Sequence, residues 1–189
     1  MIRCLYSHVN TMKMYFPKKS IIPGGNMSSF QFLASNKLLK EVKNPYIEII
    51  SINEALRRNM RIEESLMNNI NIDRDKEMLL FFDSEEHLGE MEIKNVMYYS
   101  SRYAEEYSNK QYFSELSWDY TEARAKQLVE YLKEQMNSLD EIEIWSIWLD
   151  EHKSASIKSV HINELSITDL EFLNLLKGYE TPKCLIIKR

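Results

Sequence analysis

The chain has 189 residues, of which 44% are hydrophobic and 28% are charged, and its formal net charge at pH 7 is −5. This composition is ordinary for a globular protein, while the acidic balance and the lack of a Lys/Arg cluster argue against a nucleic-acid partner. No apolar run approaches the roughly 18 residues that a membrane-spanning helix needs, so we expect no membrane partner. Cys4 and Cys184 stand far apart without a CxxC spacing, which argues against a disulfide framework and a zinc site and favours a cytoplasmic location.

Residues 1–26 differ in composition from the rest of the chain. They contain four basic residues and no acidic residue. A transit peptide would share that bias, but no amphipathic stripe is evident, and no secretory h-region is present. The segment from Pro23 to Met27 can be encoded by AGGAGG shortly before ATG, the pattern of a ribosome-binding site. We therefore expect residues 1–26 to be either a disordered tail or a translated leader that is not part of the native protein.

Residues 27–108 predict an N-terminal β-β-α-β-β half. Apolar stretches at 30–34 and 45–50 indicate two strands. Two later apolar runs, 78–82 and 91–96, flank a polar loop and predict a hairpin.

The helix of this half has a marked beginning. Ser51 and Glu54 have the spacing of a capping box, and apolar residues then recur at helical spacing as far as Ile70. Asn59 interrupts that stripe, so we expect the helix to bend or restart there. Four tyrosines then join the two halves, and either a short helix with an aromatic stripe or irregular chain fits them: Tyr98, Tyr99, Tyr103 and Tyr107.

Residues 109–189 carry a clearer pattern. Residues 112–120 alternate apolar and polar side chains, as in a strand with one buried face. Residues 121–136 then show one apolar stripe of an amphipathic helix, with Asp119 or Thr121 as its N-cap. Residues 142–149 are apolar on both parities, which predicts a strand that is covered on both faces.

The remaining elements complete this half. Residues 157–163 indicate a third strand, antiparallel to the second. Thr168 and Glu171 form a capping box for a second helix, which Gly178 ends, and a last strand follows at 184–187.

The predicted fold class is therefore α+β. The C-terminal half has the order β-α-β-β-α-β, which is ferredoxin-like and places the third strand between the first and the second. Trp145 and its apolar neighbours on the same side of the strand must be buried on the face of the sheet that the two helices do not cover. We expect the N-terminal half to supply it, so that 27–108 and 109–189 form one compact unit; a second copy of the chain or a partner protein are the alternatives.

The residues offer little sign of catalysis. Only two glycines, Gly89 and Gly178, follow Met27. The sequence after Met27 therefore contains no glycine-rich phosphate-binding motif and no nucleophile-elbow motif, and no cofactor is predicted. The spacing of Asn71, Asp73 and Asp75 resembles the opening of a calcium loop. However, the glycine and the closing glutamate of such a loop are missing, so a solvated loop is expected and no metal site is predicted.

Two groups of polar residues are candidate binding sites. Asp150, Glu151 and His152 lie at the predicted tip between the second and third strands, where a carboxylate beside an imidazole could do acid–base chemistry but solvation is the simpler expectation. His161 shares a strand face with Asn163, a polar row that could line a pocket or touch a partner. Because its neighbours on that face are neutral, we predict that His161 is not a catalytic base.

Together these features favour a small acidic cytoplasmic protein that binds another protein rather than catalysing a reaction. A basic protein is the expected partner, and one version is an inhibitor or toxin-neutralising protein whose acidic surface masks a basic site. The candidate binding residues are Trp145, His161, Asn163, Asp150, Glu151 and His152. The rival hypothesis is an enzyme or small-ligand sensor with a pocket between the two halves. Nothing in the sequence indicates an oligomeric state.

Overall fold

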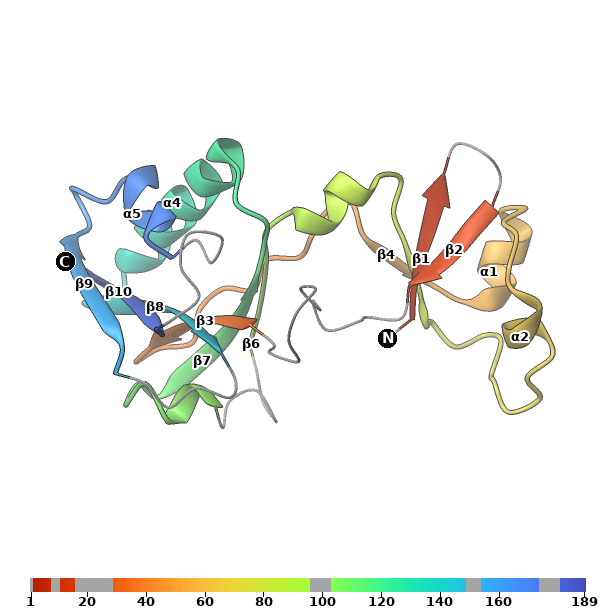
Figure 1. The fold of residues 1–189 in the computed structure, drawn as a ribbon, viewed down its shortest axis with the longest axis horizontal. Helices are drawn as coiled ribbons and strands as arrows, with labels where there is room; N and C mark the ends of the chain where they lie inside the picture. Colours follow the sequence, from red (N-terminus) through yellow and green to blue (C-terminus); the bar gives the residue numbers. More distant parts are fainter. Residues whose placement is uncertain (1, 8–10, 16–28, 96–102, 149–153, 174–180) are drawn as a thin grey trace. The chain divides into compact units, whose positions relative to one another are not determined.

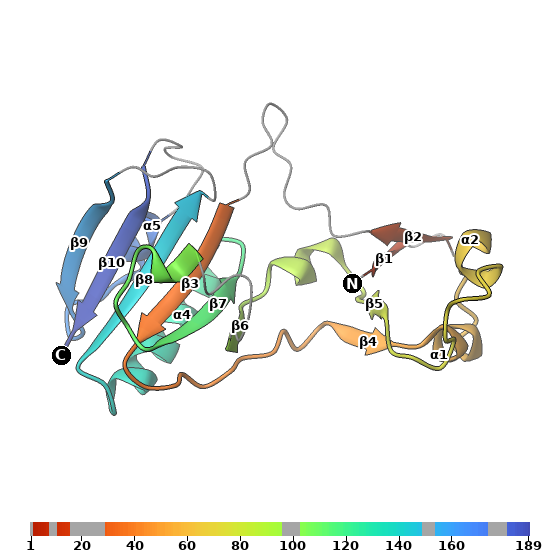
Figure 2. The ribbon, with the colours of Figure 1, turned by 90° about the horizontal axis from the view of Figure 1, so that it is seen from below.

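The structure is a computed structural model and describes residues 2–7, 11–15, 29–95, 103–148, 154–173 and 181–189. The chain forms two compact units. The first unit comprises Met1–Ser20 and Asn44–Glu90, and the second comprises Ile21–Lys43 and Met91–Arg189. Figure 1 labels most of the helices and strands named below, and Figure 2 also labels β5.

The first unit holds a four-stranded sheet with short helices. Its elements in chain order are β1 (Ile2–Ser7), β2 (Thr11–Tyr15), β4 (Glu48–Ile50), α1 (Ile52–Arg57), α2 (Glu64–Met67), β5 (Leu79–Phe81) and the 3₁₀ helix η1 (Glu85–Gly89). The strand order is β2-β1-β5-β4, with β1 parallel to β5 and the other pairs antiparallel. Its main core consists of buried apolar side chains from the ends of β4 and β5 and from the helical segment: Ile50, Ile52, Ala55, Met60, Leu66 and Leu79.

Helix α1 begins and ends where the sequence predicts. The Ser51 hydroxyl accepts a hydrogen bond from the Glu54 N–H at 3.1 Å, which satisfies one of the first amides of the helix. Asn59 has φ of 56°, in the left-handed region that asparagine tolerates better than most residues. The Met60 N–H returns to the Ala55 carbonyl at 2.9 Å, which closes the helix in a Schellman-type turn. The predicted restart is confirmed, because α2 begins only at Glu64.

The predicted hairpin between 78–82 and 91–96 is wrong. Strand β5 pairs with β4 and β1, whereas β6 (Glu92–Asn95) pairs with β7 in the second unit. The polar residues between them form η1 instead of a reverse turn. The Ser84 hydroxyl accepts from the Glu86 N–H at 3.4 Å and caps that helix, so the chain does not fold back on itself.

The second unit is a six-stranded sheet with two helices packed on one side, as Figures 1 and 2 show. Its elements are β3 (Ser29–Ser35), β6, β7 (Tyr112–Ser117), α4 (Glu122–Met136), β8 (Glu141–Trp148), β9 (Ser156–His161), α5 (Ile167–Glu171) and β10 (Lys183–Lys188). The largest core lies between the sheet and the helices, where Leu128 and Leu132 of α4 meet Leu33, Ile144 and Leu185 of the strands. This unit has the mixed α+β character that the sequence predicts.

The strand order differs from a ferredoxin-like sheet. The described elements from β7 onward do follow the order β-α-β-β-α-β, but the sheet runs β6-β7-β3-β8-β10-β9. Strand β3 occupies the place between β7 and β8 that the prediction gave to the third strand. Strand β9 lies instead at the edge and is parallel to β10, so that α5 connects two adjacent parallel strands.

Helix α5 begins two residues earlier than predicted. Its N-cap is Ser166, and the Asp169 carboxylate accepts hydrogen bonds from the Ser166 N–H at 2.9 Å and from its hydroxyl at 2.7 Å. Asp169 also pairs with Lys158 of β9 at 2.8 Å. This contact explains why the box at Ser166 prevails over the one predicted at Thr168. The predicted end at Gly178 lies outside the described residues.

The division of the chain follows strand pairing rather than position in the sequence. Strands β3 and β6 precede residue 108, yet they pair with strands of the second unit, which places parts of the predicted 27–108 half in the same sheet as 109–189. The predicted boundary after residue 26 falls among residues whose structure is not described. Among the described helices, none has the length and apolar character that a membrane crossing requires.

Candidate functional site

The sheet of the second unit has a face that α4 and α5 do not cover, called the open face below. Side chains along β8 alternate between the two faces of the sheet: Ile142 and Ile144 pack toward α4, while Trp145 and Ile147 project to the open face. All four side chains are buried. The prediction of a strand covered on both faces is therefore confirmed.

Part of the cover on the open face comes from residues 103–110. Residues 103–105 form a helical turn, and Ala104 and Tyr107 pack onto the cluster around Trp145. This segment precedes residue 109 but belongs to the second unit. The expectation that the N-terminal half as a whole covers this face stays a prediction. Tyr98 and Tyr99 of the predicted connecting helix lie outside the described residues.

An aromatic cluster organises the open face. The Phe32 ring stacks on Trp145 with centroids 6.0 Å apart and an interplanar angle of 10°. Phe113 meets Phe32 edge-on at 6.1 Å, and Tyr107 lies 5.5 Å from Trp145. Trp145 is only 5% exposed. Contacts of this kind contribute beyond the area they bury, so Trp145 is primarily a core residue.

Beside this cluster lies an open pocket of about 400 Å³, called the open-face pocket. Its apolar wall consists of Tyr107, Trp145, Ile157 and Ile186. Ile157 is 59% exposed, a large apolar side chain at the sheet edge that the described residues leave mostly bare. The polar lining includes the side chains of Asn36, Asn109, Lys110 and Glu143.

A charge network supports the polar lining. Lys110, whose side chain is 15% exposed, pairs with Glu141 and lies 3.8 Å from Glu143. The Trp145 indole N–H donates to the Glu143 carboxylate at 2.7 Å. The burial of Cys184, with Glu143 and Glu141 adding to it, raises the pKa of its thiol to about 12. Cys184 is therefore a buried apolar residue rather than a nucleophile, because the reactive thiolate is disfavoured.

A second pocket, of about 430 Å³, lies where β9 ends, and is called the strand-end pocket. His161 and Asn163 both line it, together with Lys133 and Asn137 from the end of α4 and Arg189. The His161 Nδ1 accepts a hydrogen bond from the Asn163 N–H at 3.2 Å. No carboxylate is bonded to His161 among the described residues, and the prediction that it is not a catalytic base stays a prediction.

The candidate residues are thus divided between separate places. His161 and Asn163 come together in the strand-end pocket, whereas Trp145 lines the open-face pocket. Asp150, Glu151 and His152 lie outside the described residues.

Three cations that help to form the pockets, Lys110, Lys133 and Arg189, were not among the candidates from the sequence. Lys110 stands just before a strand with no pattern around it, and Lys133 is one of several charges on the outer face of a helix. Glu143 and Trp145 are two residues apart in a predicted strand, so their side chains lie on the same face of the sheet. That spacing is the feature of the sequence from which part of the open-face pocket could be predicted.

The other polar candidates are held by local contacts. The Asp73 carboxylate accepts from the Asp75 N–H at 3.0 Å, and the Asp75 carboxylate accepts from the side-chain amide of Asn53 in α1 at 2.7 Å, so hydrogen bonds within the loop and to α1 hold these carboxylates. Throughout the described part of the chain, no three His, Cys, Asp or Glu side chains gather in a way that could hold a metal ion.

Comparison with known proteins gives no relative: no family model, curated protein or solved structure matches this chain.

Proposed function

We propose that this chain works by binding a basic segment of another protein on the open face of its six-stranded sheet. The observation that carries the proposal is the exposed apolar side chain of Ile157 beside the open-face pocket, on a face where acidic side chains predominate. Ile157 supplies apolar area that a partner can cover, and a large exposed apolar group beside a pocket is a common mark of an interaction surface.

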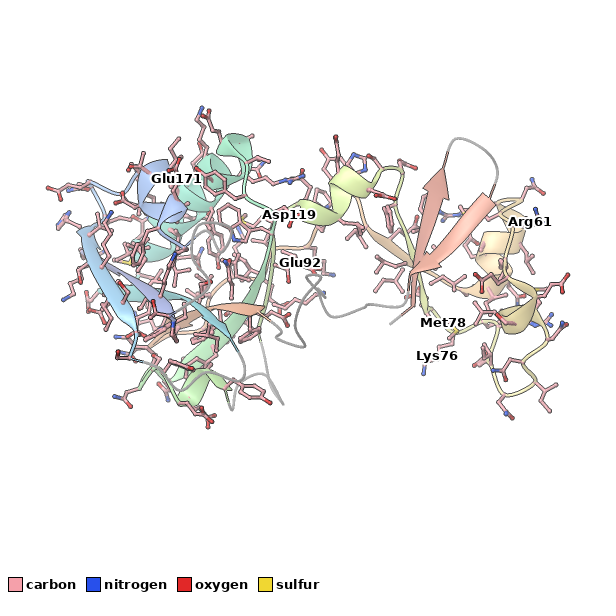
Figure 3. The ribbon with its side chains drawn as sticks, viewed as in Figure 1. Arg61, Lys76, Met78, Glu92, Asp119 and Glu171 are labelled. Carbon is pink, nitrogen blue, oxygen red and sulfur yellow. The ribbon has the colours of Figure 1, made fainter. Side chains whose placement is uncertain are left out.

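The charge of the open face favours a basic partner. Strand parity and the 103–110 segment assign six acidic and three basic side chains to this side among the described residues. They are Glu92, Glu105, Glu106, Glu115, Glu141 and Glu143 against Lys94, Lys110 and Lys188. Figure 3 labels Glu92 on β6, at one end of the strand order. Such an imbalance steers oppositely charged partners and disfavours acidic ones.

The edge position of β9 extends this surface. The Ser156 and Ile162 amides donate to carbonyls of the neighbouring chain segment, Pro182 at 2.8 Å and Lys188 at 2.7 Å. By alternation, the amides of Ile157 and Ser159 point away from β10. An extended segment of the partner can therefore lie along β9 and place a side chain next to Ile157. An inhibitor or toxin-neutralising protein that masks a basic site is one form that this function takes.

Affinity capture from the native host tests the proposal. The full chain and its Ile157→Lys variant serve as baits, and mass spectrometry identifies what each retains. We expect a basic protein that the wild-type chain retains at low salt, that the variant loses, and that elutes as salt screens the acidic face. If the two baits retain the same proteins, or if nothing is retained specifically, the proposal fails.

A further inference from the structure

The strand-end pocket is lined by polar side chains that make few contacts with the rest of the described structure. The Lys133 ammonium and the side-chain amides of Asn137 and Asn163 make no hydrogen bond or ion pair within the described part of the chain. They come from two separate elements, the last turn of α4 and the turn after β9, and converge on one hollow of about 430 Å³. Long polar side chains that gather without binding one another leave donors available to a ligand.

The orientation of His161 adds another donor. Since its Nδ1 accepts the Asn163 N–H at 3.2 Å, the neutral ring carries its proton on Nε2. The His161 carbonyl also accepts from the Glu164 N–H at 2.9 Å, which fixes the turn that follows β9. His161 therefore presents an N–H group in both its neutral and its protonated form.

Arg189 is held in place at the wall of the same pocket. Its backbone N–H donates to the Asp140 carbonyl at 3.0 Å, and its guanidinium donates to the Asn137 carbonyl at 2.6 Å. The latter bond offsets the partial negative charge at the C-terminal end of α4. A guanidinium has five N–H donors, so further donors remain for a ligand.

The charged side chains among the described lining residues of this pocket are of one sign. Lys133 and Arg189 line it, and no Asp or Glu side chain lies among its described lining residues. Asp140 pairs with Arg189 at 3.9 Å, but the Asp140 side chain is 98% exposed and such pairs are weak in water. The pocket is thus a local cationic site in an acidic chain.

We propose that the strand-end pocket binds a small oxyanion, a phosphate- or carboxylate-bearing molecule, through Lys133, Arg189 and the His161 N–H. Charged donors bind oxyanions more strongly than neutral donors do, and the amides of Asn137 and Asn163 supply neutral donors at the rim. The volume exceeds that of a lone inorganic anion and suits a small organic molecule that carries one. This site is separate from the open-face pocket and does not depend on the protein partner proposed above.

Nuclear magnetic resonance titration of the full chain tests this proposal. The probes are inorganic phosphate, glycerol 3-phosphate and citrate, each compared with sodium chloride at equal ionic strength. We expect saturable shifts at the amides of His161 and Asn163 with at least one probe and none with chloride. Tighter binding of glycerol 3-phosphate than of inorganic phosphate indicates a phosphorylated metabolite, and tighter binding of citrate indicates a polycarboxylate.

Two matched variants decide whether the pocket itself is responsible. Lys133→Gln should weaken binding of the best probe at least about ten-fold, since a charged hydrogen bond is lost. Lys126→Gln, an exposed lysine on the same helix that does not line the pocket, should bind as the wild type does. Equal binding by Lys133→Gln and the wild type, or shifts that chloride reproduces, would overturn the proposal.

Discussion

At the open face, some residues stabilise the fold and others are available for binding. Trp145 is the clearest example of a residue that stabilises the fold. Its ring is held between Phe32 and Tyr107, and its indole N–H is bonded to Glu143. Ile157, by contrast, contributes little to the core because most of its side chain is exposed. The fold therefore depends on Trp145, while Ile157 can change without unfolding the chain.

Trp145→Ala should lower the free energy of unfolding by about 3 to 5 kcal/mol, as expected when a large aromatic side chain is removed from a core. Trp145→Phe should lower it less, because the ring stacking on Phe32 is retained and chiefly the indole hydrogen bond is lost. Urea denaturation followed by circular dichroism measures both changes. A loss below about 1 kcal/mol for Trp145→Ala would show that the ring is not part of the core.

Asp169 links pH to stability at the beginning of α5. Burial would raise the pKa of its carboxyl, but hydrogen bonds from Lys158 and Ser166 outweigh burial and lower that pKa. The charged form is thus favoured in the folded state. Its stabilising contribution is complete above the unfolded-state pKa of about 3.9 and is lost as the pH falls through the lower folded-state pKa.

Asp169→Asn should therefore cost about 1 to 2 kcal/mol at pH 7, as for the loss of a helix cap, and progressively less below pH 4. Unfolding free energies measured from pH 7 to pH 3 give this difference. Asp140→Asn is the control, because its side chain is almost fully exposed and the change should be small at every pH. A cost for Asp169→Asn that stays constant with pH would contradict the assignment.

At the scale of elements, local pattern predicted α4 and β8 because each carries its own periodicity. Thr121 is the N-cap of α4, as one of the two predicted candidates, with its hydroxyl accepting from the Arg124 N–H at 3.2 Å. At α5 the predicted box at Thr168 gives way to one at Ser166, whose partner Asp169 also pairs with Lys158 of β9, a contact that local pattern does not reveal. Tyr120 also reaches α5, where its hydroxyl donates to Glu171, labelled in Figure 3, at 3.2 Å.

Strand order could not be read from local pattern. Strand β3 lies between β7 and β8 although it precedes them by more than 70 residues. Its own sequence specifies only a strand with two buried faces, Phe32 and Ala34 on one side and Leu33 on the other. The open-face pocket includes Asn36, which follows β3, and Trp145 of β8, whereas the strand-end pocket lies at the ends of β9 and α4. Local pattern therefore indicated Trp145, His161 and Asn163 as candidates but not which of them lie together.

At the scale of the whole molecule, the two units use different parts of the chain. The first described strand of the second unit begins at Ser29, after the basic segment of residues 1–26, and the two strands described in that segment, β1 and β2, belong to the other sheet. In the first unit, β1 pairs with β5 at only two positions, Ile2 with Leu79 and Arg3 with Leu80. Any stabilising role of β1 and β2 should therefore be confined to the first unit.

A chain beginning at Met27 tests this separation. All three tryptophans of the sequence, Trp118, Trp145 and Trp148, belong to the second unit, so tryptophan fluorescence reports on that unit alone. We expect the thermal midpoint measured by fluorescence to stay within a few degrees of that of the full chain. A large drop would show that residues 1–26 support the second unit.

The central claim is that the open face binds a basic partner at Ile157. Isothermal titration of the captured partner with three chains tests it most directly: the wild type, Ile157→Lys, and Ile70→Lys as a matched control whose isoleucine is 96% exposed in the first unit. We predict that Ile157→Lys weakens binding at least about ten-fold, the range of an interface residue that loses more than 1 kcal/mol, and that Ile70→Lys leaves it unchanged. Equal affinities for all three chains, or equal losses in both variants, would contradict the claim.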